Sequence, residues 1–173
     1  MKKNICVFVF LVFTIFLKAQ DWKEITYDSL LILQMPDGSK TLDTMGIRAY
    51  YYNNASGSLQ CVINYGMKFT GKYDASSLKE EYKRCEKVSV RKMPGAVSLS
   101  KEFVTINGLT GYRLSFNAKI NSKDMYVDQV FIILKNTLFT FQYMGLEKDK
   151  SKLDVLLSKT QFTVKPQDQL ISE

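Results

Sequence analysis

Hydrophobic and polar residues alternate along several stretches of the chain, with the period expected of strands in a sheet that has one buried face. The clearest stretch runs from Tyr112 to Ile120, where apolar side chains occupy every second position. We predict strands over 25–35, 46–53, 58–67, 102–106, 112–120, 125–134 and 137–144, with a short extended end at 161–164. The last four long strands are joined by short links, including Asn107-Gly108 and Lys135-Asn136. Links of this length connect antiparallel neighbours.

Two stretches change to the spacing of an amphipathic helix. In 74–88 the apolar positions Leu78, Tyr82 and Cys85 recur at intervals of four and three, with charged residues between them. Residues 150–159 carry a similar stripe of three leucines. We therefore predict one helix in each stretch.

The order of strands, helix, two hairpins and helix predicts an α+β domain whose helices cover a twisted antiparallel sheet of about six or seven strands. The segment 125–134 is apolar on both of its faces over most of its length. We therefore expect it to be a central strand that is covered on both sides. Residues 20–164 form this single domain, and 165–173, which carries no pattern, is expected to be a flexible tail.

Residues 1–19 have the layout of a secretory signal peptide. Two lysines precede an apolar run from Ile5 to Leu17, and this run is shorter than the roughly 20 residues that span a bilayer. We predict cleavage after Ala19, and cleavage after Gln20 is the alternative. The mature chain is then expected to be periplasmic or secreted, with no integral membrane span.

Composition removes several classes of function. The chain of 173 residues has no histidine, which excludes Ser-His-Asp triads, Cys-His nucleophiles and histidine-containing zinc sites. We expect no enzymatic activity, no cofactor and no metal. Without the three lysines of the signal peptide, 21 basic residues face 17 acidic ones. This surplus is too small to indicate nucleic-acid binding.

Four stretches together carry a resemblance to a known family. They are a strand that ends in a proline turn (Leu30 to Pro36), a helix with Leu78 and Tyr82, the stretch Val104 to Tyr112, and a closing helix that ends near Ser158 to Phe162. With these features the chain resembles the PsbP and DcrB-like group of exported proteins over nearly all of residues 22–164. The resemblance implies an αβα sandwich with a central antiparallel sheet. It carries no catalytic motif.

Two cysteines remain after the signal peptide, and an oxidising compartment would let them form a disulfide. Cys61 lies in a predicted strand and Cys85 in the predicted helix that covers the sheet. Both also occupy apolar positions. The alternative is therefore that each is a small buried hydrophobic residue.

Two groups of residues are candidates for binding a partner. Lys79, Lys83 and Lys87 recur every four residues of the first predicted helix, and Arg91 and Lys92 follow them. This stripe suits an acidic partner or anionic lipid, and the alternative is a solvated helix face with local ion pairs.

The second candidate group is a run of tyrosines in one predicted strand. Tyr50 and Tyr52 share a face of that strand and could form a binding patch, while the alternative is packing in the core and at its rim.

These observations favour a non-enzymatic exported protein that binds an unidentified envelope protein as an accessory or chaperone-like module. The alternative is a carrier of a small apolar or anionic ligand held between the sheet and one helix. A hydrolase that uses carboxylates alone would need two acidic groups that converge in one cleft. An exposed strand at the sheet edge would also allow a homodimer to form by edge pairing.

Overall fold

The computed structural model describes residues 21–66, 75–93, 95–146, 149–165 and 169. In chain order the elements are β1 (Trp22–Tyr27), β2 (Leu31–Pro36), β3 (Lys40–Thr44), β4 (Ile47–Asn54), β5 (Gly57–Asn64), α1 (Ala75–Lys92), β6 (Val97–Ile106), β7 (Leu109–Ile120), β8 (Lys123–Leu134), β9 (Thr137–Gly145), α2 (Lys150–Ser158) and β10 (Thr160–Phe162). The predicted signal peptide lies outside the described residues. Within them, no helix has the length and apolar character needed to cross a bilayer.

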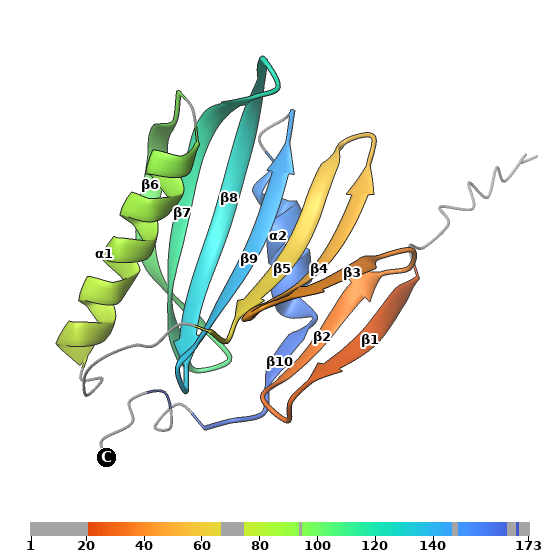
Figure 1. Cartoon of the computed structure of the whole chain (residues 1–173), viewed down its shortest axis with the longest axis vertical. Helices are drawn as coiled ribbons and strands as arrows, with labels where there is room; N and C mark the ends of the chain where they lie inside the picture. Colours follow the sequence, from red (N-terminus) through yellow and green to blue (C-terminus); the bar gives the residue numbers. More distant parts are fainter. Residues whose placement is uncertain (1–20, 67–74, 94, 147–148, 166–168, 170–173) are drawn as a thin grey trace, which may run out of the picture.

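The described strands form two sheets. The larger has the order β3-β4-β5-β9-β8-β7-β6, with every neighbouring pair antiparallel, and the smaller has the order β1-β2-β10. Figure 1 shows α1 in front of the larger sheet, on its β6–β7 side, and α2 behind it. The smaller sheet shares a core with α2. The chain is thus an α+β sandwich with its helices on opposite faces of a seven-stranded antiparallel sheet, as its sequence predicts.

The centre of the packing is β8. Every residue from Tyr126 to Leu134 is buried. Phe131 and Ile133 pack in a cluster with α1 on one face, while Val130 and Ile132 pack with α2 and β2 on the other. This confirms the expectation of a central strand that is covered on both sides. Removal of this apolar surface from water is the main driving force for the sandwich.

The first predicted strand is wrong in one respect, because 25–35 is not continuous. The chain reverses at Asp28 and Ser29, whose φ angles are 40° and 41°, and the Leu30 N–H donates to the Tyr27 carbonyl at 3.0 Å. The result is a hairpin of β1 and β2. Short polar residues such as these tolerate the left-handed conformation that a tight hairpin turn requires.

A side-chain wedge interrupts the larger sheet where β7 and β8 separate. The ladder between these strands ends at Tyr112 and Phe131, so Thr110 and Ile133 do not pair directly. The fully buried Tyr82 of α1 fills this gap: its hydroxyl donates to the Thr110 carbonyl at 2.6 Å and accepts the Ile133 N–H at 3.1 Å. The phenol therefore replaces a missing backbone partner.

Gln169 completes the same wedge from the far end of the chain. Its carboxamide accepts the Thr110 N–H at 2.8 Å and donates to the carbonyls of Thr110 and Ile133 at 2.7 and 3.1 Å. Gln169 is 4% exposed. This residue thus departs from the flexible tail that the sequence suggests for 165–173, while 166–168 and 170–173 lie outside the described residues.

Replacement of Tyr82 by Phe is expected to lower the free energy of unfolding by about 1–3 kcal/mol. The reason is that the buried Ile133 N–H then has no partner. Urea unfolding measures the change. Tyr51→Phe, at a half-buried position on β4, serves as the control and is expected to change stability by less than about 0.5 kcal/mol. Equal stability of the Tyr82→Phe variant and the parent would show that the wedge is not needed.

Candidate functional site

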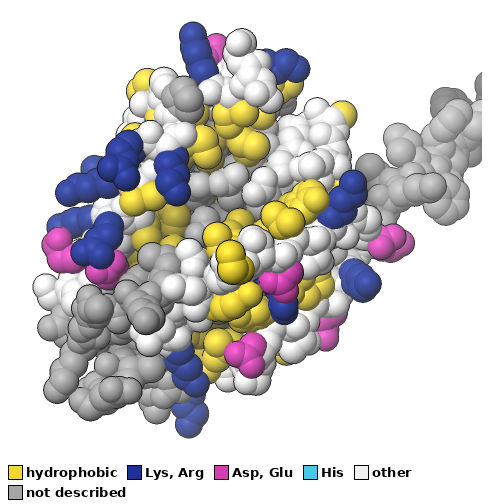
Figure 2. Space-filling model, in the orientation of Figure 1, with side chains coloured by type: hydrophobic (Ala, Val, Ile, Leu, Met, Phe, Trp, Pro, Cys, Tyr) yellow, Lys and Arg dark blue, Asp and Glu magenta, His cyan; other side chains and the backbone are white. Residues whose placement is uncertain are grey.

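The structure places all five basic residues of the predicted stripe on the exposed side of α1. We call Lys79, Lys83, Lys87, Arg91 and Lys92 the α1 basic face. Figure 2 shows Lys and Arg side chains gathered over this helix. The opposite side of α1 carries Leu78, Tyr82 and Cys85 into the core. The helix is therefore amphipathic in the sense that the sequence predicts.

The charges on α1 are only partly compensated. Its three acidic residues form ion pairs: Glu80 with Lys83 at 3.2 Å, Glu81 with Arg84 at 3.3 Å, and Glu86 with Lys101 of β6 at 3.2 Å. Against them α1 carries six basic residues, which gives the helix a formal charge of +3. Most of the surplus positive charge expected of the mature chain thus lies on this one element.

A hollow lies between α1 and the edge strand β6. We call it the α1–β6 trough; it has a volume of about 240 Å³ and is lined by Lys83, Glu86, Lys87, Lys101, Phe103 and Tyr112. Phe103 is 45% exposed and its ring lies 5.1 Å from that of Tyr112. The Lys79 ammonium lies 5.7 Å from the centre of the Phe103 ring. The trough thus combines an apolar floor with cationic walls.

The carboxylate of Glu86 in this trough is already bound by two neighbouring side chains. Tyr112 donates to one oxygen of Glu86 at 2.5 Å, and Lys101 binds the other at 3.2 Å. Partial burial raises the pKa of Glu86, but the hydrogen bonds from Tyr112 and Lys101 outweigh it and hold that pKa below its ordinary value. Glu86 is therefore ionised at neutral pH and paired within the protein.

The two tyrosines proposed as a binding patch turn inward instead. Tyr50 is 6% exposed and belongs to the core cluster that includes α2. Tyr52 is half-buried and packs against the same cluster. The alternating direction of side chains on β4 sends both toward the smaller sheet, and this placement favours the packing alternative.

Cys61 and Cys85 are free thiols, and both are buried. Cys61 belongs to the cluster on the α2 side of the sheet and Cys85 to the cluster on the α1 side. The sheet therefore separates them, and the disulfide that the sequence left open is not formed. Burial raises the pKa of the Cys85 thiol to about 11 and raises that of Cys61 as well. Neither thiol is an activated nucleophile.

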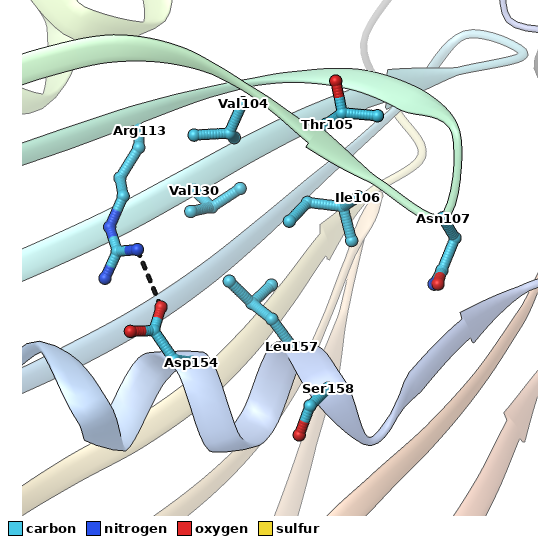
Figure 3. Close-up of a pocket in the computed structure, with 9 residues that line it drawn as sticks. All are labelled: Val104, Thr105, Ile106, Asn107, Arg113, Val130, Asp154, Leu157 and Ser158. Atoms are coloured by element: carbon cyan, nitrogen blue, oxygen red, sulfur yellow. Dashed lines mark hydrogen bonds and ion pairs between the residues drawn. The ribbon is translucent and has the colours of Figure 1, made fainter.

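A second hollow lies between the larger sheet and α2, as Figure 3 shows. It has a volume of about 300 Å³, and Val104, Ile106, Val130 and Leu157 supply its apolar wall. Arg113 and Asp154 line it together.

Arg113 is held between two carboxylates. Its Nε and Nη2 donate to the fully buried Asp128 at 3.1 and 2.6 Å, and its Nη1 donates to Asp154 at 2.7 Å. The hydrogen bond to Asp128 is the main reason that the pKa of Arg113 is raised above its ordinary value. The three groups carry one net negative charge. Both carboxylates are bound to the guanidinium of Arg113. Two carboxyl groups that act as acid and base in hydrolysis would instead have to be accessible to a substrate.

The described residues contain no group of three Cys, Asp or Glu side chains placed to hold a metal ion.

Thiol accessibility follows from the burial of both cysteines. In the folded mature chain neither cysteine is expected to react with an aromatic disulfide reagent at pH 8 within minutes, and both are expected to react at once in denaturant. Absorbance of the released thiolate measures the stoichiometry. If both thiols were detected in denaturant only after a reducing agent is added, the two cysteines would form a disulfide.

The Arg113 cluster is expected to be structural, and a pair of variants tests it. Arg113→Met leaves the carboxylate of Asp128 buried without a partner and is expected to cost about 3–5 kcal/mol of unfolding free energy. The double variant Arg113→Met with Asp128→Leu is expected to recover most of that loss. Arg48→Met breaks the exposed pair with Asp43 and is the control, with a cost below about 1 kcal/mol. Equal costs for the two single variants would contradict the role of burial.

Comparison with known proteins finds no matching family model and no matching curated protein. Among solved structures, cyanobacterial PsbP (CyanoP) from Synechocystis sp. PCC 6803 is 13% identical, with 83% of this chain and 93% of that chain covered and a TM-score of 0.57. LpqN of Mycobacterium tuberculosis, described as involved in cell envelope biogenesis, is 16% identical, with 84% and 92% covered and a TM-score of 0.52. At these identities the likeness concerns the fold. The chain therefore has the PsbP-like fold that its sequence resemblance implies.

Proposed function

We propose that this chain is a non-enzymatic, exported protein that binds an acidic partner protein of the cell envelope as an accessory or chaperone-like module. The observation that carries the proposal is the α1 basic face beside the α1–β6 trough. A concentrated charge of one sign attracts an oppositely charged partner and orients it during approach. The apolar floor of the trough then offers surface that such a partner can cover.

The alternative is that the α1 basic face binds no partner, is solvated, and forms only local ion pairs. Ion pairs within α1 involve Lys83 and Arg84, and Arg91 with Lys92 lies in the last turn, where cations stabilise the helix dipole. Lys79 and Lys87 take part in none of the ion pairs among the described residues and lie outside the last turn of α1. Lys79 lies over the ring of Phe103, and Lys87 lines the α1–β6 trough. These two residues favour an external partner over a purely local function.

Two further observations support an accessory role outside the cytoplasm. The predicted signal peptide directs export, and one protein of the same fold is described as involved in cell envelope biogenesis. Asp154, which lines the hollow near α2, and the buried Asp128 are both bound to Arg113. This arrangement favours binding over catalysis.

The carrier alternative has weaker support. The hollow between the sheet and α2 is where such a ligand would lie, and its wall is apolar. The two carboxylates on Arg113 disfavour an anionic ligand, because the cation there is already neutralised. A small uncharged ligand is the version of this hypothesis that fits best.

Charge reversal on α1 tests the proposed function. The variant Lys79→Glu/Lys83→Glu/Lys87→Glu is expected to lose the envelope proteins that the immobilised mature chain retains at about 50 mM salt. The control variant Lys40→Glu/Lys123→Glu/Lys135→Glu changes the net charge equally at exposed positions outside α1 and β6, and it is expected to keep these proteins. Each retained protein is then purified and titrated against all three chains by calorimetry. Equal affinity for the two variants, or no specific partner at all, would overturn the proposal.

A further inference from the structure

The exposed edge of β6 is a feature that the basic face alone does not explain. β6 ends the larger sheet and, among the described strands, pairs only with β7. It is ten residues long, whereas β3 at the opposite edge has five. Val97 and Phe103 on β6 are 62% and 45% exposed. A long edge strand with exposed apolar side chains is a template for pairing with another chain, because its outer backbone groups are free.

We infer that the β6 edge accepts an extended acidic segment of the partner as an eighth strand of the larger sheet. This inference rests on the proposed function and specifies how the partner binds. Backbone hydrogen bonds to β6 would supply affinity, and side chains at alternate positions would supply specificity. The partner segment is thus expected to be acidic and extended, with side chains that alternate between the two faces of the sheet.

The positive charge beside β6 predicts which positions of the partner segment are acidic. Lys101 and Phe103 lie on the α1 side of the sheet, beside Lys83 and Lys87 of the trough. Alternate side chains of an added strand would face this same side of the sheet and would lie directly beside Lys101 and Phe103. Carboxylates there would meet several ammonium groups, and an apolar side chain would cover the exposed ring of Phe103. The opposite side carries Glu102, so acidic residues are disfavoured at the intervening positions.

A second copy of this chain fits the edge poorly. Antiparallel pairing of β6 with β6 keeps both α1 helices on the same side of the joined sheet. The two basic faces would then approach each other, and pairing centred on Lys101 would place like charges opposite each other. These features favour an acidic partner over the homodimer.

Synthetic peptides separate strand addition from simple charge attraction. The probe is a fluorescent ten-residue peptide in which Glu alternates with Val and one Glu, at the position that would face Phe103, is replaced by Phe. Its binding to the mature chain is followed by anisotropy at about 50 mM salt. We expect saturable binding, and we expect methylation of alternate backbone nitrogens on the edge that pairs with β6 to weaken it at least about tenfold. Amide exchange of β6 is expected to slow in the complex.

Four outcomes would count against the inference, and they differ in what they say of the proposed function. Equal binding of the methylated peptide, or of one with its Glu residues in a single block, would overturn strand addition and leave charge recognition in place. Binding of a Lys-Val peptide as tightly as the Glu-Val peptide would overturn charge selection. Absence of binding by every acidic peptide would overturn the inference, and the charge-reversal experiment on α1 decides the proposed function separately.

A matched pair of variants locates the binding edge. Phe103→Ser on β6 is expected to weaken peptide binding at least about fivefold, since it removes the floor of the trough. Leu42→Ser on the opposite edge strand β3, where the side chain is 55% exposed, is expected to leave binding unchanged. Thermal unfolding shows that each variant is folded before it is titrated. The reverse order of effects would place the peptide on β3 and contradict the inference.

Discussion

The burial of β8 on both faces is the constraint on which the rest of the structure depends. A strand that is apolar at successive positions must be covered from two sides, and so the sheet needs a layer in front and a layer behind. α1 supplies one layer by packing on β7 and β8, and α2 with the smaller sheet supplies the other. This placement of α1 turns its lysines toward water and leaves β6 as a long, partly uncovered edge. The candidate binding surface is thus a consequence of how the core is closed.

Much of the fold could be predicted because it depends on local patterns. The hairpins around Asn107-Gly108 and Lys135-Asn136 occur where the sequence predicts them, since such residues adopt the positive φ angles of tight turns. β3 was missed because all five of its residues are exposed, so no hydrophobic alternation marks it. α1 extends beyond the predicted end at residue 88 because Val90 packs against the core from the added turn.

The candidate site was predictable only where one element carries it. The spacing of Lys79, Lys83 and Lys87 reveals the basic stripe, but nothing local indicates that Lys101 and Phe103 lie beside it. The signal that could have revealed the Arg113 cluster was Asp128, an acidic residue inside the most apolar strand. A buried carboxylate requires a partner, although the sequence does not identify which cation supplies it.

The insertion of Gln169 between β7 and β8 ties a residue near the end of the chain to the middle of the larger sheet. Its carboxamide donates to the carbonyl groups of Thr110 and Ile133 at the point where the two strands separate. A chain truncated before residue 169 would keep every described strand and helix, but the buried carbonyl of Ile133 would lose this donor. Truncation is therefore expected to loosen this sheet locally without changing the order of its strands.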